Sequence, residues 1–374
     1  MNMHTAASQY ANRPKDERFG SVEALIEHSK REREASRQTT YNLKELTIVP
    51  TQANGDLYGQ GSPTLTLASP KGRANFTHWS FNQFARSIGA PASYLRTLPP
   101  SVAADAMNFG IQQTDAGTAM NLLLRAPKNG EALPTVRAGT SEKYARLWDV
   151  EIYEPLNDAL LSKDSRWQLP LTWEGPRAGA YAGDRDSFLI VTNGGSIVND
   201  PSAGANGAMF RGLMVRNSEV GGGAVSIEHI LFRYICGNHI LWGAVMDKRF
   251  RRRHFGHNTR RDVLQHILWA AANFAESSPG RDEAIIRNLI SHEIATTEAG
   301  VVDELKALGF TKDKAQAAYD ACKQHEQSLS PRSFWGLIQG ATRVSQESGF
   351  QDERLQLDRL AAQLLKRGAA LVTV

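Results

Sequence analysis

The strongest chemical signal in the sequence is a group of cationic side chains near residue 250. Seven cations and no acid occur between Asp247 and Asp262: Lys248, Arg249, Arg251, Arg252, Arg253, Arg260 and Arg261. Four ring-bearing side chains are interleaved with them: Phe250, His254, Phe255 and His257. Guanidinium groups bind phosphate oxygens bidentately, and aromatic rings offer faces on which unpaired bases stack. We therefore predict that residues 248–261, called the basic segment below, bind nucleic acid, with single-stranded DNA as the favoured partner.

The excess of positive over negative charge in the chain comes from this segment. The chain has 43 lysines and arginines against 39 acidic residues, which gives a net charge of +4. The seven cations of the basic segment exceed that total, so the rest of the sequence is net acidic. Two other interpretations stay open. The arginines could contact an acidic face of a second copy of the chain, or they could form a solvated helix face whose phenylalanines point into the core.

A second candidate phosphate site follows a predicted strand at residues 134–138. Arg137, Lys143 and Arg146 occur there together with Ser141 and Tyr144. Arginine, serine and tyrosine at a strand end are residue types that contact phosphate. An equally good interpretation places the tyrosine in the core, because another aromatic residue follows it at helical spacing.

Carboxylates form the basis of an alternative function. Asp184 and Asp186 are two positions apart and would lie on the same side of a strand, and Asp149 is a further acid. A Mg²⁺-dependent nuclease needs two or three acids that converge on one metal ion. The other interpretation is a turn, because Gly183 precedes the two aspartates. Mg²⁺ is expected only under the nuclease alternative, and otherwise no cofactor is expected.

A zinc site is a weaker possibility. Cys236 and His239 have metal-ligand spacing, and His229, His254 or His257 would have to complete the set. Structural zinc requires four ligands, and nothing in the spacing fixes that geometry. We therefore predict no bound metal and a buried Cys236.

The elements that must position these residues indicate an α+β fold. Residues 1–40 are predicted to form a charged N-terminal arm, and residues 41–275 an α+β core of mainly antiparallel sheet with flanking helices. Within the core, residues 209–216 and 224–234 flank a glycine-rich turn and predict a hairpin. Residues 276–374 have helical periodicity throughout and predict an all-helical C-terminal third.

The composition restricts the class of protein. No apolar run approaches 18 residues, so we expect no membrane-spanning helix. The N-terminal residues lack the apolar core of a secretory signal, and two cysteines are too few for a disulfide framework. The chain lacks a P-loop motif, which argues against a nucleotidase of that class. These features predict a soluble protein of the cytoplasm.

Several ordered motifs resemble those of a phage/plasmid-like family of unknown function found on mobile elements. A helix-and-proline segment spans residues 76–95. An Arg-Ala-x-x-Ser-x-x-Tyr pattern occurs at residues 137–144, and an Asn-Ser…Gly…Arg-x-x-Cys-x-Asn pattern at residues 217–238. An Arg-His pair at 253–254 and a further match at 334–343 complete the series. The resemblance covers about residues 70–345 and implies a mobile-element origin, without catalytic residues to transfer. His239 departs from the pattern, because a small or aliphatic residue is expected there.

These observations favour a protein that binds or anneals single-stranded nucleic acid, as expected for replication or recombination of a mobile element. We expect such a protein to act as a homo-oligomer. Two alternatives stay open: a metal-dependent nuclease, or an inhibitor that binds a host protein through the helical C-terminal region.

Overall fold

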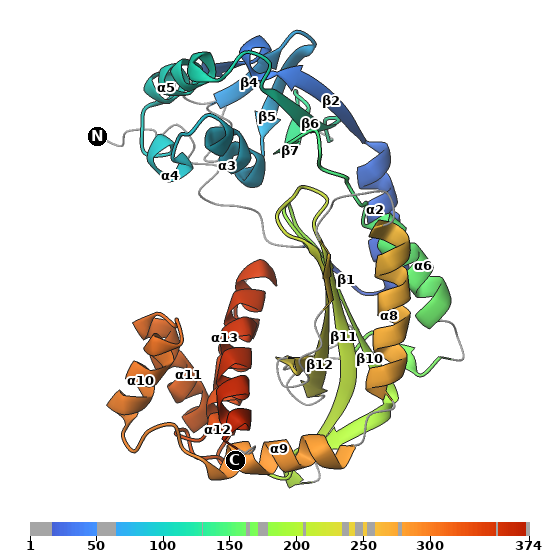
Figure 1. The fold of residues 1–374 in the computed structure, drawn as a ribbon, viewed down its shortest axis with the longest axis vertical. Helices are drawn as coiled ribbons and strands as arrows, with labels where there is room; N and C mark the ends of the chain where they lie inside the picture. Colours follow the sequence, from blue (N-terminus) through green and yellow to red (C-terminus); the bar gives the residue numbers. More distant parts are fainter. Residues whose placement is uncertain are drawn as a thin grey trace.

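The computed structural model describes residues 17–50, 65–128, 130–161, 165–170, 179–204, 207–233, 239–243, 250–252, 259–275, 279–348 and 351–371. Two separate sheets, each with its own helices, form the α+β fold that the sequence predicts (Figure 1). Antiparallel pairing predominates, and the last third of the chain is helical in its described part. None of the described helices is both long enough and apolar enough to cross a lipid bilayer.

The first sheet contains six strands in the order β2-β6-β7-β5-β4-β3. Their bounds are β2 (Ser36–Asn42), β3 (Thr47–Pro50), β4 (Leu65–Ser69), β5 (Gly72–Phe76), β6 (Ala119–Arg125) and β7 (Thr135–Thr140). All neighbouring strands are antiparallel except β5 and β7, which pair in parallel. A crossover of helices between β5 and β6 makes this parallel neighbour possible. The short helix η1 (Leu43–Glu45) connects β2 to β3.

The helices of the crossover are α3 (His78–Ser87), α4 (Ala92–Leu95) and α5 (Pro100–Gln113). Thr77 caps α3, because its hydroxyl accepts a 3.0 Å hydrogen bond from the backbone N–H of Ser80. Phe81 and Phe84 of α3 are both buried in the core of the first sheet. Among the described residues, that core draws on those between Tyr41 and Val136.

The second sheet is antiparallel in its described part and follows the order β1-β9-β10-β11-β12-β13, with β8 on β10 and β14 on β12. Its strands are β1 (Glu17–Phe19), β8 (Trp167–Gln168), β9 (Ala180–Ala182), β10 (Ser187–Asn199), β11 (Ala208–Asn217), β12 (Val225–Arg233), β13 (His239–Leu241) and β14 (Phe250–Arg252). The hairpin predicted around the glycine-rich turn is confirmed as β11–β12. The turn of this hairpin points toward the first sheet (Figure 1).

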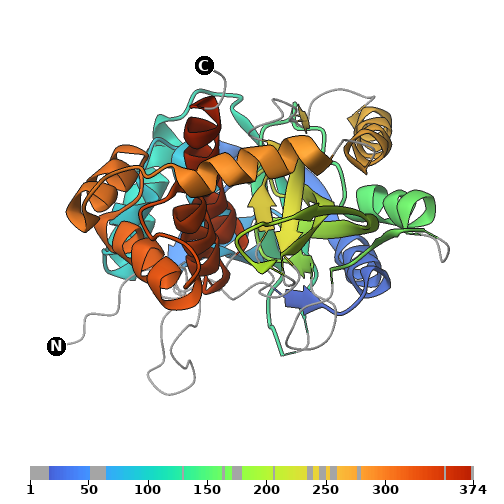
Figure 2. The ribbon, with the colours of Figure 1, turned by 90° about the horizontal axis from the view of Figure 1, so that it is seen from below.

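Helices cover both faces of the second sheet (Figures 1 and 2). Leu189 and Val191 point to the face covered by α2 (Val22–Glu34), α6 (Val150–Leu160) and α8 (Thr259–Ala275). The alternate residues Phe188 and Ile190 point to the opposite core. This core also contains residues of α9 (Pro279–Ser291), α10 (Glu298–Ala307), α11 (Lys312–His325), α12 (Phe334–Gln346) and α13 (Gln351–Ala370).

The packing connects segments on both sides of the predicted boundaries at residues 40 and 275. Strand β1 pairs with β9, and Leu25 of α2 is buried in the core between the second sheet, α6 and α8. Residues 1–16 of the predicted arm lie outside the described residues. The helices after residue 275 share one hydrophobic core with the strands β10, β11 and β12. The second sheet and the C-terminal helices therefore form one packing unit.

Candidate nucleic-acid interface

The described part of the basic segment lies at one edge of the second sheet and at the start of α8. Strand β14 pairs antiparallel with β12, which places Phe250 opposite Ile227 and Arg251 opposite Ser226. Arg251 and Arg261 are both exposed. Only the backbone of Arg252 and Arg260 is described. Five predicted site residues lie outside the described residues: Lys248, Arg249, Arg253, His254 and Phe255.

An aromatic stack holds this edge strand against α8. The rings of Phe250 and His266 are stacked, with centroids 4.1 Å apart and planes inclined by 27°. His266 is oriented by a 2.9 Å hydrogen-bond contact between its Nδ1 and the carbonyl oxygen of Asp262. Phe250 is half-buried and also packs against the core formed by α6 and α8. This packing favours a structural role for Phe250 over the stacking of a base.

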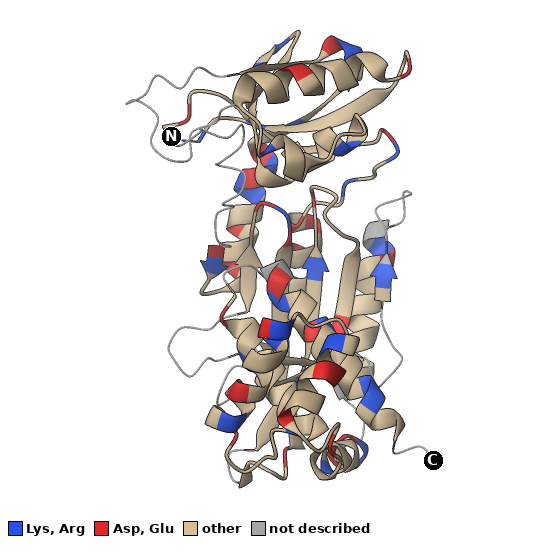
Figure 3. Ribbon diagram, turned by 90° about the vertical axis from the view of Figure 1, so that its left-hand side faces the viewer, with Lys and Arg blue, Asp and Glu red and all other residues tan. Residues whose placement is uncertain are grey.

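The arginines of the second sheet divide into neutralised and exposed groups. Three buried arginines form ion pairs with buried or nearly buried carboxylates: Arg211 with Asp282, Arg216 with Asp186 and Arg233 with Glu326. Arg251 and Arg261, by contrast, form no ion pair with any residue in the described ranges. Elsewhere, basic and acidic residues are interspersed along the helices (Figure 3). Exposed arginines without a carboxylate partner in the described ranges thus occur at the β14–α8 edge, and also at Arg18 on β1, whose guanidinium lies over the ring of Tyr181.

Two residues of the second candidate phosphate site are engaged inside the molecule. Arg137 donates a 2.9 Å hydrogen bond to Oε2 of Glu219, whose side chain is 3% exposed. Arg146 donates to the backbone carbonyl oxygen of the same residue. Burial lowers the pKa of Arg146 to about 10, so this guanidinium remains charged at neutral pH. Among the three cations predicted here, Lys143 alone is exposed.

Glu219 lies in the turn of the β11–β12 hairpin, and side chains of α3 and of the segment after β7 form hydrogen bonds with this turn. Trp79 and Gln83 of α3 both donate side-chain hydrogen bonds to the carbonyl oxygen of Val220, at 3.0 and 2.7 Å. Tyr144 donates a 2.9 Å hydrogen bond to the carbonyl oxygen of Ser218. Three of the motif segments identified in the sequence thus meet around one turn. Glu219 had no predicted role, and its position before three glycines is the one sequence feature that marks it.

The carboxyl group of Asp149 belongs to the same network. Its Oδ1 accepts a 2.6 Å hydrogen bond from Asn217, and its backbone N–H donates 2.9 Å to Oε1 of Glu219. Burial, and then the nearby carboxylate of Glu219, raise the pKa of Asp149 to about 8. Asp149 therefore retains its proton at neutral pH.

The remaining predicted acids lie in a turn and not on a strand. Asp184 and Asp186 belong to the connection between β9 and β10, which agrees with the turn interpretation. Asp186 is 4% exposed and accepts a 2.8 Å hydrogen bond from Arg216. Within the described ranges, no three histidine, cysteine, aspartate or glutamate side chains come close enough together to hold a metal ion.

The predicted zinc residues have other surroundings where they are described. Nε2 of His239 lies 2.6 Å from Oδ2 of Asp358 on α13, and both side chains are buried. His229 is buried and its ring meets that of Phe274 edge-on, with centroids 4.6 Å apart. Cys236, His254 and His257 lie outside the described residues. The contact with Asp358 also gives a physical reason for the unexpected histidine at position 239.

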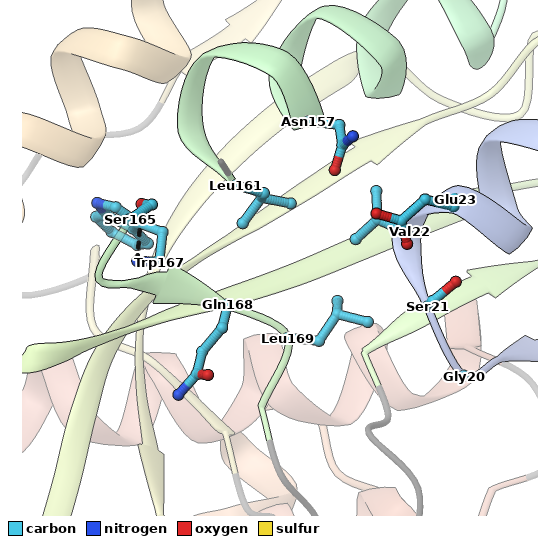
Figure 4. A pocket seen from close by; sticks show the side chains of 10 residues that line it. All are labelled: Gly20, Ser21, Val22, Glu23, Asn157, Leu161, Ser165, Trp167, Gln168 and Leu169. Atoms are coloured by element: carbon cyan, nitrogen blue, oxygen red, sulfur yellow. Dashed lines mark hydrogen bonds between the residues drawn. The ribbon is translucent and has the colours of Figure 1, made fainter. Parts of the chain in front are cut away.

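A groove of about 290 Å³ opens between the start of α2, the end of α6 and strand β8 (Figure 4). Its lining residues are Gly20, Ser21, Val22, Glu23, Asn157, Leu161, Ser165, Trp167, Gln168 and Leu169. None of these described lining residues is a lysine, arginine or histidine, and Glu23 adds a negative charge. This groove is therefore poorly suited to phosphate.

The comparisons with known proteins yield no match: no family model, no curated protein and no solved structure is similar to this chain at a significant level.

Proposed function

We propose that this protein binds single-stranded nucleic acid through its basic segment at the β14–α8 edge. One observation carries the proposal: Arg251 and Arg261 of this segment are exposed and form no ion pair in the described part of the chain. The buried arginines Arg211, Arg216 and Arg233 are neutralised by carboxylates, so they do not compete for this role. Exposed guanidinium groups without a protein carboxylate are suited to phosphate oxygens.

The proposed preference for a single strand rests on the sequence, which places His254, Phe255 and His257 among these cations. Unpaired bases present their faces to aromatic rings, whereas the bases of a duplex are already stacked on each other. We propose DNA as the strand, strand annealing by a homo-oligomer as the activity, and the cytoplasm as the location. The resemblance to a family of mobile elements supports this choice, because such elements expose single strands when they replicate and recombine.

The test is fluorescence anisotropy with a labelled oligonucleotide of about 40 residues, single- or double-stranded, between about 50 and about 300 mM salt. If all seven cations contact phosphates, log K should fall with log[salt] with a slope of about −5, because each contact contributes about −0.7. The double variant Arg251→Ala/Arg261→Ala should bind more weakly, with a slope reduced by about 1.4.

The matched control removes two exposed arginines elsewhere. Arg86→Ala/Arg287→Ala lowers the net charge by the same amount, at the end of α3 and on α9. Wild-type binding by the control and weakened binding by the test variant would support the proposal. Equal affinity of all three proteins would contradict it. Shortening of the oligonucleotide after addition of Mg²⁺ would favour the nuclease alternative, and absence of binding at low salt would favour a protein partner.

A further inference from the structure

The two edges of the first sheet differ in how their backbone groups are satisfied. At the β3 edge, the side-chain amide of Asn108 on α5 accepts a 2.8 Å hydrogen bond from the N–H of Ile48 and donates one of 2.9 Å to its carbonyl oxygen. Strand β3 also ends at Pro50, which has no backbone N–H. At the opposite edge, β2 pairs with β6, and none of the described strands pairs with its other side (Figure 1). The chain thus seals one edge of this sheet and leaves the other open.

The pairing of β2 with β6 determines which backbone groups point to the open edge. Ala35 and Leu43, just before and just after β2, both form backbone hydrogen bonds with the chain at the ends of β6. In an antiparallel pair, residues that exchange hydrogen bonds alternate with residues whose N–H and C=O point away. The odd-numbered residues of β2 are therefore bonded to β6, and Gln38 and Thr40 direct their backbone groups outward. Both of these residues are exposed.

Strand β2 also lacks the features that protect most exposed edge strands. Natural edges are kept short, or carry lysine, proline or a bulge, so that they do not pair with other chains. The strands β1, β13 and β14 at the borders of the second sheet have three residues each. Strand β2 has seven residues, contains neither lysine nor proline, and keeps one continuous register with β6. Among the described strands, β2 is therefore the one best suited to pair with another chain.

We infer that β2 pairs antiparallel with β2 of a second copy, about a two-fold axis at Thr39. In this register Gln38 lies opposite Thr40 of the second copy, and each such pair exchanges two N–H···O=C hydrogen bonds. The two six-stranded sheets become one sheet of twelve strands. The inference names a contact for the homo-oligomer, and it rests on the proposed function only for the expectation that copies associate.

The side chains of β2 complement themselves in this register. Thr39 lies opposite Thr39 of the second copy, and paired threonines stabilise neighbouring strands. Arg37 is the one charged residue of β2, and it lies opposite Tyr41 of the second copy, so that like charges do not meet. A dimer related by a two-fold axis uses the same surface of both copies and is closed. The self-complementary sequence therefore favours a second copy over a strand of another protein.

The first test places charges on the two-fold axis. Sedimentation velocity of the full chain over a concentration series should show a dimer of the wild type. Thr39→Lys and Thr39→Glu should each raise the dissociation constant about 2- to 5-fold, because like charges then lie directly opposite each other. An equimolar mixture of the two variants should recover the dimer, since Lys and Glu then face each other. Thr47→Lys is the matched control, because Thr47 is exposed on β3 at the sealed edge.

The second test removes an outward N–H and leaves the pairing with β6 intact. Thr40→Pro should raise the dissociation constant about 5- to 150-fold, because the dimer loses one hydrogen bond in each of its two Gln38–Thr40 pairs. Thr40→Ala keeps the N–H and should associate as wild type. Circular dichroism of both variants should match the wild type, because proline is tolerated on an edge strand where its nitrogen faces solvent.

A third test checks the register directly. The two Thr39 Cα atoms should lie about 4.5 Å apart, so Thr39→Cys should form a disulfide between copies under oxidising conditions. The two Arg37 Cα atoms should lie about 14 Å apart, so Arg37→Cys should not form one. Wild type, which has Cys236 and Cys322, is the control for the native thiols.

Three results would overturn the inference: a wild type that remains monomeric at every concentration, a dimer that Thr40→Pro leaves intact, or charge variants at Thr39 whose mixture associates no better than either alone. Dimers that persist in Thr40→Pro would assign the contact to another surface. Failure of the proposed function is a separate outcome, because it is read from oligonucleotide binding by Arg251→Ala/Arg261→Ala. A dimer through β2 that binds no oligonucleotide would contradict that function and leave this inference in place.

Discussion

Arg137 and Glu219 are 82 positions apart in the sequence, and their side chains form a 2.9 Å ion pair between the first sheet and the turn of the β11–β12 hairpin. Glu219 also accepts the backbone N–H of Asp149 at 2.9 Å. The carboxylate of Glu219 thus contacts two segments that lie 82 and 70 positions away from it in the sequence. The contact between the first sheet and the hairpin turn is therefore centred on one buried charge.

We expect Glu219→Gln to destabilise the protein by about 3 kcal/mol, because loss of one partner leaves the charge of Arg137 buried without full compensation. Urea unfolding followed by circular dichroism measures the change. Glu304→Gln is the control, since its ion pair with Arg367 is exposed and should contribute less than about 1 kcal/mol. Equal losses of stability in the two variants would show that the network around the hairpin turn stabilises the protein no more than an exposed ion pair does.

Asp149 should give the stability of the protein a distinctive pH dependence. The pKa of Asp149 is about 8 in the folded protein and about 4 in an unfolded chain. As the pH rises from about 4 to about 8, the unfolded state loses a proton that the folded state keeps. Stability that is fully present below about pH 4 is therefore lost progressively up to about pH 8.

Asp149→Asn should remove this dependence, because the amide stays neutral and still accepts the hydrogen bond from Asn217. The variant should gain stability relative to wild type as the pH is raised from about 5 to about 8.5 in urea-unfolding series. Asp303→Asn, at a position 73% exposed on α10, provides the comparison and should follow the wild-type profile. Parallel profiles for wild type and Asp149→Asn would contradict the raised pKa.

The buried ion pair between Arg211 and Asp282 joins the second sheet to α9. Asp282 also accepts a 3.0 Å hydrogen bond from the indole of Trp242, so its removal leaves two buried donors without their partner. We expect Asp282→Ala to cost about 3–5 kcal/mol. The change in the midpoint of thermal unfolding measures it, and Asp313→Ala on the exposed side of α11 is the control. A loss below about 1 kcal/mol would mean that water replaces the carboxylate.

Gly340 allows α11 and α12 to approach closely. A Cβ atom at this position would overlap the backbone carbonyl oxygen of Ala318, which cannot move without distortion of α11. Gly340→Ala should therefore destabilise the protein by at least about 1–3 kcal/mol, although alanine favours helices. Gly20→Ala is the control, because nothing lies within 4 Å of the place that its new methyl group would take. Unchanged stability of Gly340→Ala in urea unfolding would refute the close approach.

The sequence predicts those parts of the fold that depend on neighbours along the chain. The hairpin around the three glycines is such a local pattern, and the structure confirms it. The same holds for the α+β class and the helical last third. Each follows from periodicity or turn chemistry within about 20 residues.

Such local patterns do not predict contacts between residues that are far apart in the sequence. Arg137 and Arg146 have the composition of a phosphate site, yet the acid that engages them lies in a hairpin turn more than 70 positions away. Residue type alone does not distinguish a cation that binds a ligand from one neutralised by a buried carboxylate.

The shared core of the second sheet and the C-terminal helices has a consequence for biosynthesis. The first sheet needs only residues between Tyr41 and Val136 for its core, so it can fold while the rest of the chain is still being translated. The core on one face of β10–β12 instead requires Leu355 and Leu364 of α13, which are synthesised more than 120 residues after the end of β12. Until then the face of this sheet opposite α2, α6 and α8 stays uncovered, so we expect the second half of the nascent chain to depend on chaperones more than the first.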